Sequence, residues 1–217
     1  MSKRASAIAV AAGLGLFLGA NSAYACKGQH VQFQDDFREV DQTWGTEQDG
    51  DAVSVEEGKV KFKADADAGY AVLYGGALFD DADICVTVQM PNNFKQGDTI
   101  EAGPLFWAQD HSNYYYFEID PNGKVALERK VKGKWVTVLG WRQIPTAKTG
   151  SGAKNTLRVT TSGNTITLYL DDTKIASVKG QQPDGGGQIG LRADSEKDKR
   201  DTWKFMNLKV TDVAPGG

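Results

Sequence analysis

Aromatic and acidic side chains alternate along one stretch of this chain in a way that could support ligand binding. Tyr114, Tyr116 and Glu118 occupy every second position, so a β-strand would place all three on one face. Aromatic rings stack on the apolar faces of other rings, and carboxylates accept hydrogen bonds from hydroxyl groups. Saccharides offer both kinds of surface, so the pattern predicts saccharide-binding chemistry.

A turn signal after this stretch indicates which residues share that face. Residues 120–123, Asp-Pro-Asn-Gly, predict a type I turn with glycine at the left-handed bulge position. Phe117 then opposes Leu127 on an apolar side that we expect to be core. Glu128 joins Tyr116 on the open side.

Two further residues complete the expected face. A short connection at 110–113 would set Phe106 beside Phe117 and Trp107 beside Tyr116, on the open side. Arg192 alternates with inward-pointing apolar neighbours and could add a hydrogen-bond donor. The predicted ligand-binding residues are Trp107, Tyr114, Tyr116, Glu118, Glu128 and Arg192. The alternative is that these residues only stabilise a sheet as cross-strand pairs.

The elements that must position these residues are strands throughout. After Val31, no segment carries apolar residues at helical spacing over three turns, whereas alternating runs recur between Gly, Asn and Asp clusters. So many strands predict two stacked antiparallel sheets. The expected strands are 53–55, 59–64, 70–74, 84–90, 100–108, 114–120, 125–131, 135–139, 156–161, 165–171, 174–178, 188–193 and 203–211.

Several motifs give the chain a resemblance to a known superfamily. They are Asp35-Asp36-Phe37 with Trp44-Gly45, Tyr116-Phe117-Glu118-Ile119, Leu157-Arg158-Val159, residues 166–171, residues 187–191 and residues 205–210. In this order they resemble the concanavalin A-like lectin and glucanase jelly rolls. Within that superfamily they resemble laminin-G-like and keto-disaccharide-hydrolase-related domains. The resemblance implies an all-β, two-sheet antiparallel jelly-roll sandwich that binds a saccharide or polysaccharide on its concave face.

Catalysis is the alternative that this resemblance raises. Glu118-Ile119-Asp120 is similar to the start of the laminarinase-type strand motif, in which a second glutamate acts as the acid. Here a tight turn replaces the second glutamate, so we assign no catalytic residue and expect a non-catalytic, lectin-like domain. A glycoside or keto-disaccharide hydrolase on the same face, and a structural or protein-interaction module with no small ligand, remain alternatives.

The N-terminus predicts export. Lys3 and Arg4 precede a short apolar run, and Ala23-Tyr24-Ala25 is typical of a signal-peptide cleavage site. We therefore expect a signal peptide at 1–25, one domain at 26–213 and a disordered tail at 214–217. The expected location is periplasmic or secreted, without membrane insertion after cleavage. Lipid modification of Cys26 is the alternative to a free N-terminus there.

Cysteine count and charge limit the remaining chemistry. Cys26 and Cys85 are the two cysteines, and an oxidising compartment favours a disulfide between them over two free thiols. The formal net charge of −3 makes nucleic acid an unexpected partner.

A metal site has only weak sequence support. No cofactor is expected, although many jelly rolls of this type hold a structural calcium ion. Its sequence-local candidates are Asp35 and Asp36, or Asp80, Asp81 and Asp83. These acidic groups form no dedicated loop motif, so we assign no ligands.

Overall fold

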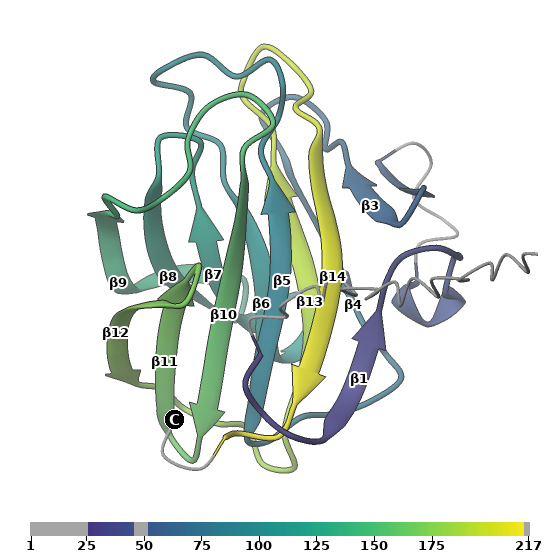
Figure 1. Cartoon of the computed structure of the whole chain (residues 1–217), viewed down its shortest axis with the longest axis vertical. Coiled ribbons are helices and arrows are strands. Elements are labelled where there is room, and N and C mark those ends of the chain that lie inside the picture. Colours follow the sequence, from purple (N-terminus) through teal and green to yellow (C-terminus); the bar gives the residue numbers. More distant parts are fainter. Residues whose placement is uncertain (1–25, 46–51, 215–217) are drawn as a thin grey trace, which may run out of the picture.

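The computed structural model describes residues 26–45 and 52–214 as two antiparallel β-sheets stacked face to face (Figure 1). One sheet has eight strands in the order β12-β11-β10-β5-β14-β3-β2, with β1 also paired to β14. The other has six strands in the order β4-β13-β6-β7-β8-β9. The predicted signal peptide, and residues 215–217 of the predicted tail, lie outside the described residues.

The strand bounds match the predicted alternating runs closely. The eight-stranded sheet contains β1 (Val31–Asp35), β2 (Val53–Glu56), β3 (Lys59–Phe62), β5 (Ala82–Gln89), β10 (Lys154–Ser162), β11 (Thr165–Leu170), β12 (Thr173–Lys179) and β14 (Trp203–Thr211). The six-stranded sheet contains β4 (Gly69–Leu73), β6 (Ala102–Asp110), β7 (Asn113–Ile119), β8 (Lys124–Val131), β9 (Lys134–Gln143) and β13 (Gln188–Asp194). The only helix in the described ranges is the 3-10 turn η1 (Gln42–Trp44).

The all-β sandwich is therefore confirmed, with one strand that was not expected. The strand β1 has mostly exposed residues and pairs only with β14. Its sequence lacks a clear alternation of buried apolar and exposed polar residues, so little in the pattern marks it as a strand.

The core lies between the sheets and is strongly aromatic. Phe62, Trp203 and Phe205 come from the eight-stranded sheet, and Phe106 and Phe117 from the six-stranded sheet. All five are fully buried. Within the described ranges, no helix is long and apolar enough to cross a bilayer.

The predicted hairpin of β7 and β8 is confirmed in register. Phe117 pairs with Leu127 and Tyr116 with Glu128. Gly123 adopts a φ of +82°, which L-residues with side chains rarely take. One face of the hairpin therefore packs into the core and the other faces away from it, as the alternation predicted.

The predicted position of Trp107 is wrong. A β-bulge between Phe106 and Asp110 shifts the register of β6, so Leu105, and not Trp107, pairs with Tyr116. Trp107 has a φ of +48°, and its ring packs in the core against Phe106 and Tyr115. A bulge breaks strict alternation, which is why the two neighbours Phe106 and Trp107 both point inward.

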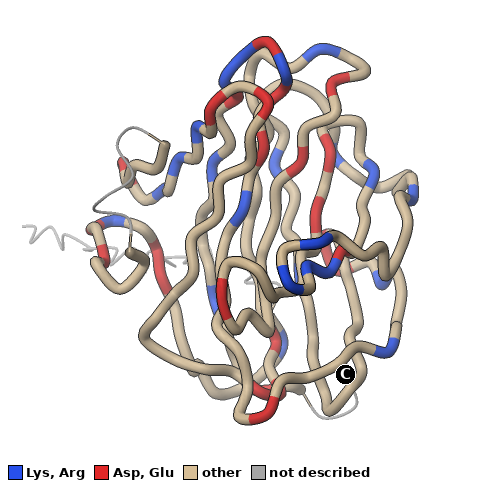
Figure 2. The backbone as a smooth tube through the Cα atoms, turned by 180° about the vertical axis from the view of Figure 1, so that it is seen from behind, with Lys and Arg blue, Asp and Glu red and all other residues tan. Residues whose placement is uncertain are grey.

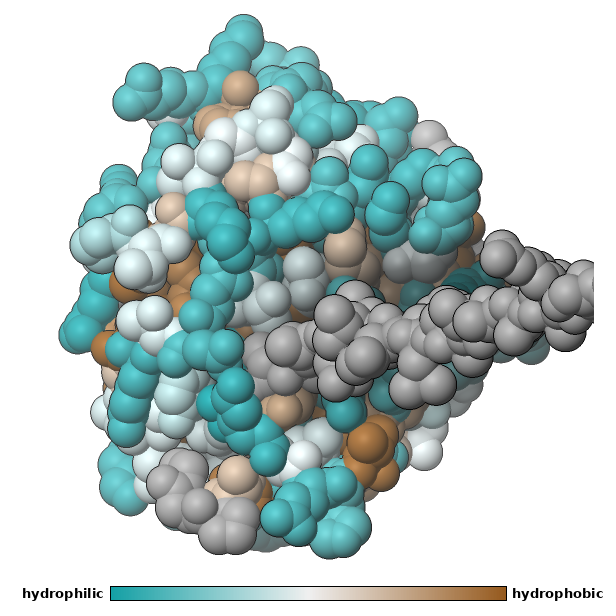
Figure 3. Space-filling model, viewed as in Figure 1, coloured by the Kyte–Doolittle hydropathy of each residue, from teal (hydrophilic) through white to brown (hydrophobic). Residues whose placement is uncertain are grey.

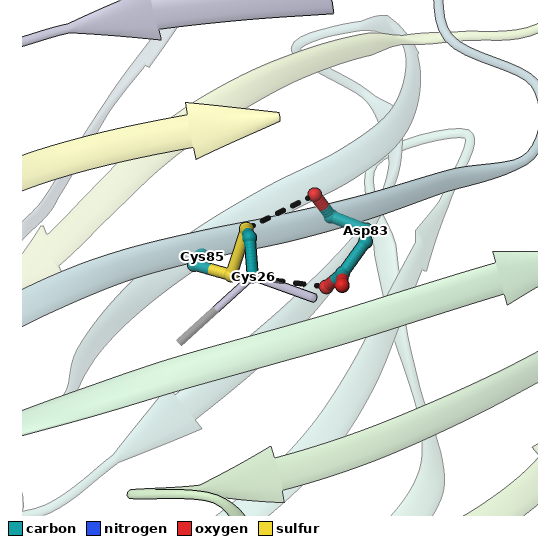
Figure 4. A group of neighbouring side chains, drawn as sticks. All are labelled: Cys26, Asp83 and Cys85. Atoms are coloured by element: carbon teal, nitrogen blue, oxygen red, sulfur yellow. Dashed lines mark hydrogen bonds between the residues drawn. A yellow bond between two sulfur atoms is a disulfide. The ribbon is translucent and has the colours of Figure 1, made fainter. Parts of the chain in front are cut away.

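The predicted disulfide joins Cys26 to Cys85 and attaches the first described residue to the central strand β5 (Figure 4). Asp83 lies beside it and accepts a hydrogen bond from the backbone N–H of Lys27 at 2.8 Å. Its carboxylate also takes two hydrogen bonds from the Arg158 guanidinium, at 2.7 and 2.9 Å. A buried ion pair between Asp83 and Arg158 therefore lies next to the disulfide.

Hydrophilic residues cover most of the outer surface of the molecule on the side shown in Figure 3, with smaller hydrophobic patches between them. This view is the same as that of Figure 1, in which the eight-stranded sheet lies in front. The six-stranded sheet lies behind it and forms the opposite side of the molecule.

Candidate functional site

A cleft of about 650 Å³ lies on the outer face of the six-stranded sheet. Figure 2 shows the molecule from this side, with acidic positions on the strands of the sheet. Four of the six predicted ligand-binding residues line the cleft: Tyr116, Glu118, Glu128 and Arg192. Tyr116 and Glu118 form its floor and are only 1% and 3% exposed, so the face is less open to solvent than the sequence suggested.

Small residues leave room around Glu118. Glu118 pairs with Ala126 on β8, and the backbone of Gly103 on β6 lies directly against its Cα. Gly103 in turn pairs with Arg192 on β13. Because neither neighbouring strand places a bulky side chain beside Glu118, its carboxyl is accessible from the cleft although it is almost fully buried.

Glu118 belongs to a group of four acidic residues that we call the carboxyl cluster: Glu101, Glu118, Glu128 and Asp194. Burial, followed by repulsion from Glu101, Glu128 and Asp194, raises the pKa of Glu118 to about 9. Burial and the nearby Asp194 raise the pKa of Glu101 to about 8. Both groups therefore carry a proton at neutral pH and can donate as well as accept a hydrogen bond.

Arg192 is a mostly buried cation beside the carboxyl cluster. Its guanidinium pairs with Asp194 at 2.7 Å and lies 5.7 Å from the centre of the Tyr116 ring. Gly69 on β4 makes space for this pair, since a Cβ there would overlap the guanidinium. Burial opposes the charge of Arg192, but Asp194 raises its pKa on balance, so the guanidinium stays charged.

The sequence-based selection of site residues missed two tryptophans. Trp135 and Trp141 on β9 line the cleft, and their exposed fractions are 44% and 46%. Trp135 follows a tight turn and pairs with Lys130, so extending the hairpin register past this turn could have identified it. The same alternation also places Trp141 on the side of Trp135, because the two register shifts in β9 cancel and only turn the intervening Leu139 into the core.

Tyr114 supports the cleft without lining it. Its ring is 2% exposed and meets the Trp135 ring edge-on, with centroids 5.7 Å apart. The Lys130 ammonium lies 5.5 Å from the Tyr114 ring and 5.3 Å from the Trp135 ring. Tyr114 and Lys130 thus hold Trp135 over the sheet.

Residues 97–99 form one wall of the cleft, and we call them its lip. The Thr99 backbone N–H donates to Glu196 at 2.7 Å, and the Lys199 ammonium bonds Asp98 at 2.5 Å and Asp201 at 3.0 Å. Asp201 is fully buried. The mixed-charge segment 195–201 therefore holds the lip in place.

Among the aspartates considered for calcium, Asp35, Asp81 and Asp83 have other partners for their carboxylates in the structure. Asp35 accepts hydrogen bonds from the Phe37 N–H and from Trp44 Nε1, at 2.7 and 2.8 Å. Asp83 is paired with Arg158. Asp81 accepts a hydrogen bond from the Gly163 N–H at 2.7 Å.

Several solved structures share this architecture. A carbohydrate-binding module, CBM66, from Bacillus subtilis is 18% identical, with a TM-score of 0.55 over 70% of this chain and 86% of that one. A β-glucanase from Bacillus licheniformis is 11% identical, with a TM-score of 0.59 over 82% and 97%. The metal-free carbohydrate recognition domain of Emp46p is 13% identical, with a TM-score of 0.62 over 84% and 97%. At these identities the likeness establishes the fold alone, a concanavalin A-like jelly roll.

Sequence comparison identifies the family. No curated protein sequence matches the chain significantly. The family model of the 3-keto-alpha-glucoside-1,2-lyase-like domain matches residues 30–211, which span both sheets and the cleft. The chain therefore belongs to the 3-keto-alpha-glucoside-1,2-lyase-like family.

Proposed function

We propose that this protein binds a saccharide in the cleft of the six-stranded sheet. The observation that carries the proposal is the pairing of two half-exposed tryptophans, Trp135 and Trp141, with a floor of hydrogen-bonding groups. Tryptophan rings match the apolar faces of sugar rings, and Glu118, Glu128 and Arg192 match their hydroxyl groups. Trp135 and Trp141 thus take the stacking role that the sequence suggested for Trp107.

Two further points support this proposal. Structural neighbours of the chain include a carbohydrate-binding module and a carbohydrate recognition domain. The volume of the cleft also falls in the range of ordinary ligand pockets, about 300–1,000 Å³.

We also infer that the protein works outside the cytoplasm. The disulfide between Cys26 and Cys85 supports this, because such bonds persist in oxidising compartments. The predicted signal peptide is consistent with the same location.

A second candidate function is proton transfer on the bound sugar, and the protonated carboxyl of Glu118 favours it. In a 1,2-elimination from a 3-keto-glucoside, a base removes the C2 proton, which the neighbouring ketone makes acidic. The C1–O bond breaks as a C1–C2 double bond forms, and the departing oxygen takes a proton. Glu118 is suited to supply that proton, and another member of the carboxyl cluster is suited to accept the C2 proton.

One experiment tests both candidates. Proton NMR of the full chain with a panel of glucosides and methyl 3-keto-α-glucoside should show binding by the wild type. Trp135→Ala and Trp141→Ala should each weaken it about tenfold, the equivalent of about 1.4 kcal/mol of lost stacking. Consumption of the keto-sugar, lost in Glu118→Gln while binding persists, would favour catalysis.

The matched control is Val136→Ala, since Val136 is as exposed as its neighbour Trp135 but does not line the cleft. It should bind like the wild type. If the wild type binds no sugar of the panel, or if both tryptophan variants bind normally, the cleft is not the saccharide site.

A further inference from the structure

A second hollow of about 610 Å³ adjoins the cleft. The two share three residues, Gly97, Asn122 and Lys124, so they are continuous across the turn that joins β7 to β8. The far side of the hollow is formed by Phe94 and Thr149, which lie in loops, and by Gln143 at the end of β9.

The turn between the hollows is a well-defined ridge. The Asp120 N–H donates to the Lys124 carbonyl at 2.9 Å, and the Lys124 N–H donates to the Asp120 carboxylate at 2.7 Å. Gly123 allows a close approach here, because a Cβ would contact Ala147 and Thr149. The loop carrying Thr149 therefore packs against the ridge and encloses the hollow.

The chemistry of the second hollow suits a neutral sugar ring. Phe94 is partly buried and packs against the core cluster, so its ring is held in place while one part faces the hollow. Gln96, Gln143 and Thr149 provide amide and hydroxyl groups for hydrogen bonds. Among the described residues that line this hollow, none is acidic, in contrast to the carboxyl cluster of the cleft.

Lys124 lies at the junction. Among the described residues its ammonium takes part in no ion pair, and its side chain lines both hollows. It can therefore donate hydrogen bonds to hydroxyl groups on either side of the ridge.

We propose that the ligand is an oligosaccharide whose chain crosses the turn 120–124 and places a further neutral sugar ring on Phe94 in the second hollow. This inference rests on the proposed saccharide binding in the cleft. It adds that the binding site selects for chain length, since a single sugar would fill only the first hollow.

The test is calorimetric titration of the full chain with linear gluco-oligosaccharides of one to five rings, in α- and β-linked series. Affinity should rise about tenfold or more from the shortest sugar that binds to the longest. Phe94→Leu preserves the apolar packing but removes the aromatic ring, so it should abolish this rise while leaving the affinity for the short sugar unchanged. Phe94→Tyr should retain the rise.

The outcomes separate this inference from the proposed function. Binding with no dependence on chain length, or a rise that survives in Phe94→Leu, overturns the extended site but leaves binding in the cleft intact. Binding of no sugar in either series overturns both. Melting temperatures of the two variants close to that of the wild type verify that the fold is preserved.

Discussion

At the scale of single residues, the carboxyl of Glu118 is the most unusual group in this protein. It is almost fully buried, lies between two small residues and faces three other acidic side chains. The positive charge that lowers the pKa of Glu118 is that of Arg192, and this guanidinium is already paired with Asp194. In this position the protonated carboxyl of Glu118 therefore has a lower free energy than the ionised carboxylate.

This environment predicts how stability depends on pH. The ordinary pKa of 4.5 rises to about 9 in the folded protein, so the folded state binds a proton that the unfolded chain releases. Stability should then fall as pH rises from about 4.5 to 9, by up to about 1.4 kcal/mol per pH unit. Glu118→Gln keeps the neutral shape and should remove the part of this decline that Glu118 contributes, while the part due to the raised pKa of Glu101 remains, as measured by urea unfolding across that window.

Glu39→Gln is the matched control, because Glu39 is an exposed glutamate outside the cleft. It should follow the wild-type profile. Parallel pH profiles for Glu118→Gln and the wild type would mean that Glu118 is ionised at neutral pH.

At the scale of elements, irregular features determine the shape of the cleft. The bulge in β6 turns Trp107 into the core, and the register shifts in β9 turn Leu139 into the core between Thr137 and Trp141, which line the cleft. The lip is held by the segment 195–201, which is about a hundred residues away in sequence. Bulges and long-range ion pairs therefore shape the cleft as much as regular pairing does.

The ion pairs of Lys199 with Asp98 and Asp201 lead to a prediction about the lip. Lys199→Met keeps much of the side-chain length but removes the bonds to Asp98 and Asp201, leaving the buried Asp201 without its cation. We expect a loss of about 1–3 kcal/mol in stability and faster amide hydrogen exchange in residues 91–99. Hydrogen-exchange mass spectrometry of the full chain measures the second effect.

Lys197→Met serves as the control, since Lys197 lies in the same segment with an exposed side chain. Its exchange pattern should match that of the wild type. Unchanged exchange in residues 91–99 of Lys199→Met would show that the lip is held by other contacts.

At the scale of the whole molecule, the N-terminal segment and the cleft lie on different sheets. Cys26 joins β5 in the eight-stranded sheet, whereas the cleft lies on the outer face of the six-stranded sheet. The bond closes a loop of 59 residues, which restricts the unfolded chain. The disulfide should therefore raise the free energy of unfolding of the whole domain without changing the geometry of the cleft.

Replacing both cysteines by serine should lower the free energy of unfolding by about 2–4 kcal/mol. The saccharide affinity at a temperature where the variant is folded should be unchanged. Urea unfolding of the variant and of the wild type, with and without reductant, measures the first effect. An unfolding midpoint equal to that of the oxidised wild type, or a loss of affinity in the folded variant, would contradict this assignment.

Local sequence patterns were sufficient to predict much of this structure. Alternation along Tyr114–Glu118 and the turn at 120–123 predicted the hairpin, its register and the face that carries Tyr116, Glu118 and Glu128. The cysteine count predicted the disulfide. These inferences succeed because period-two alternation, turn chemistry and cysteine pairing depend on few residues at a time.

The tertiary structure decided the rest. Whether Trp107 faces the core or the cleft depends on a bulge, and the inward position of Leu139 depends on register shifts with a neighbouring strand. The pKa of Glu118 depends on Glu101, Glu128 and Asp194, which three other strands or loops bring together. The sequence by itself determined the face that carries the site and all the strands but β1. Only the packing of distant segments decided which side chains meet there, because their contacts have no local signature.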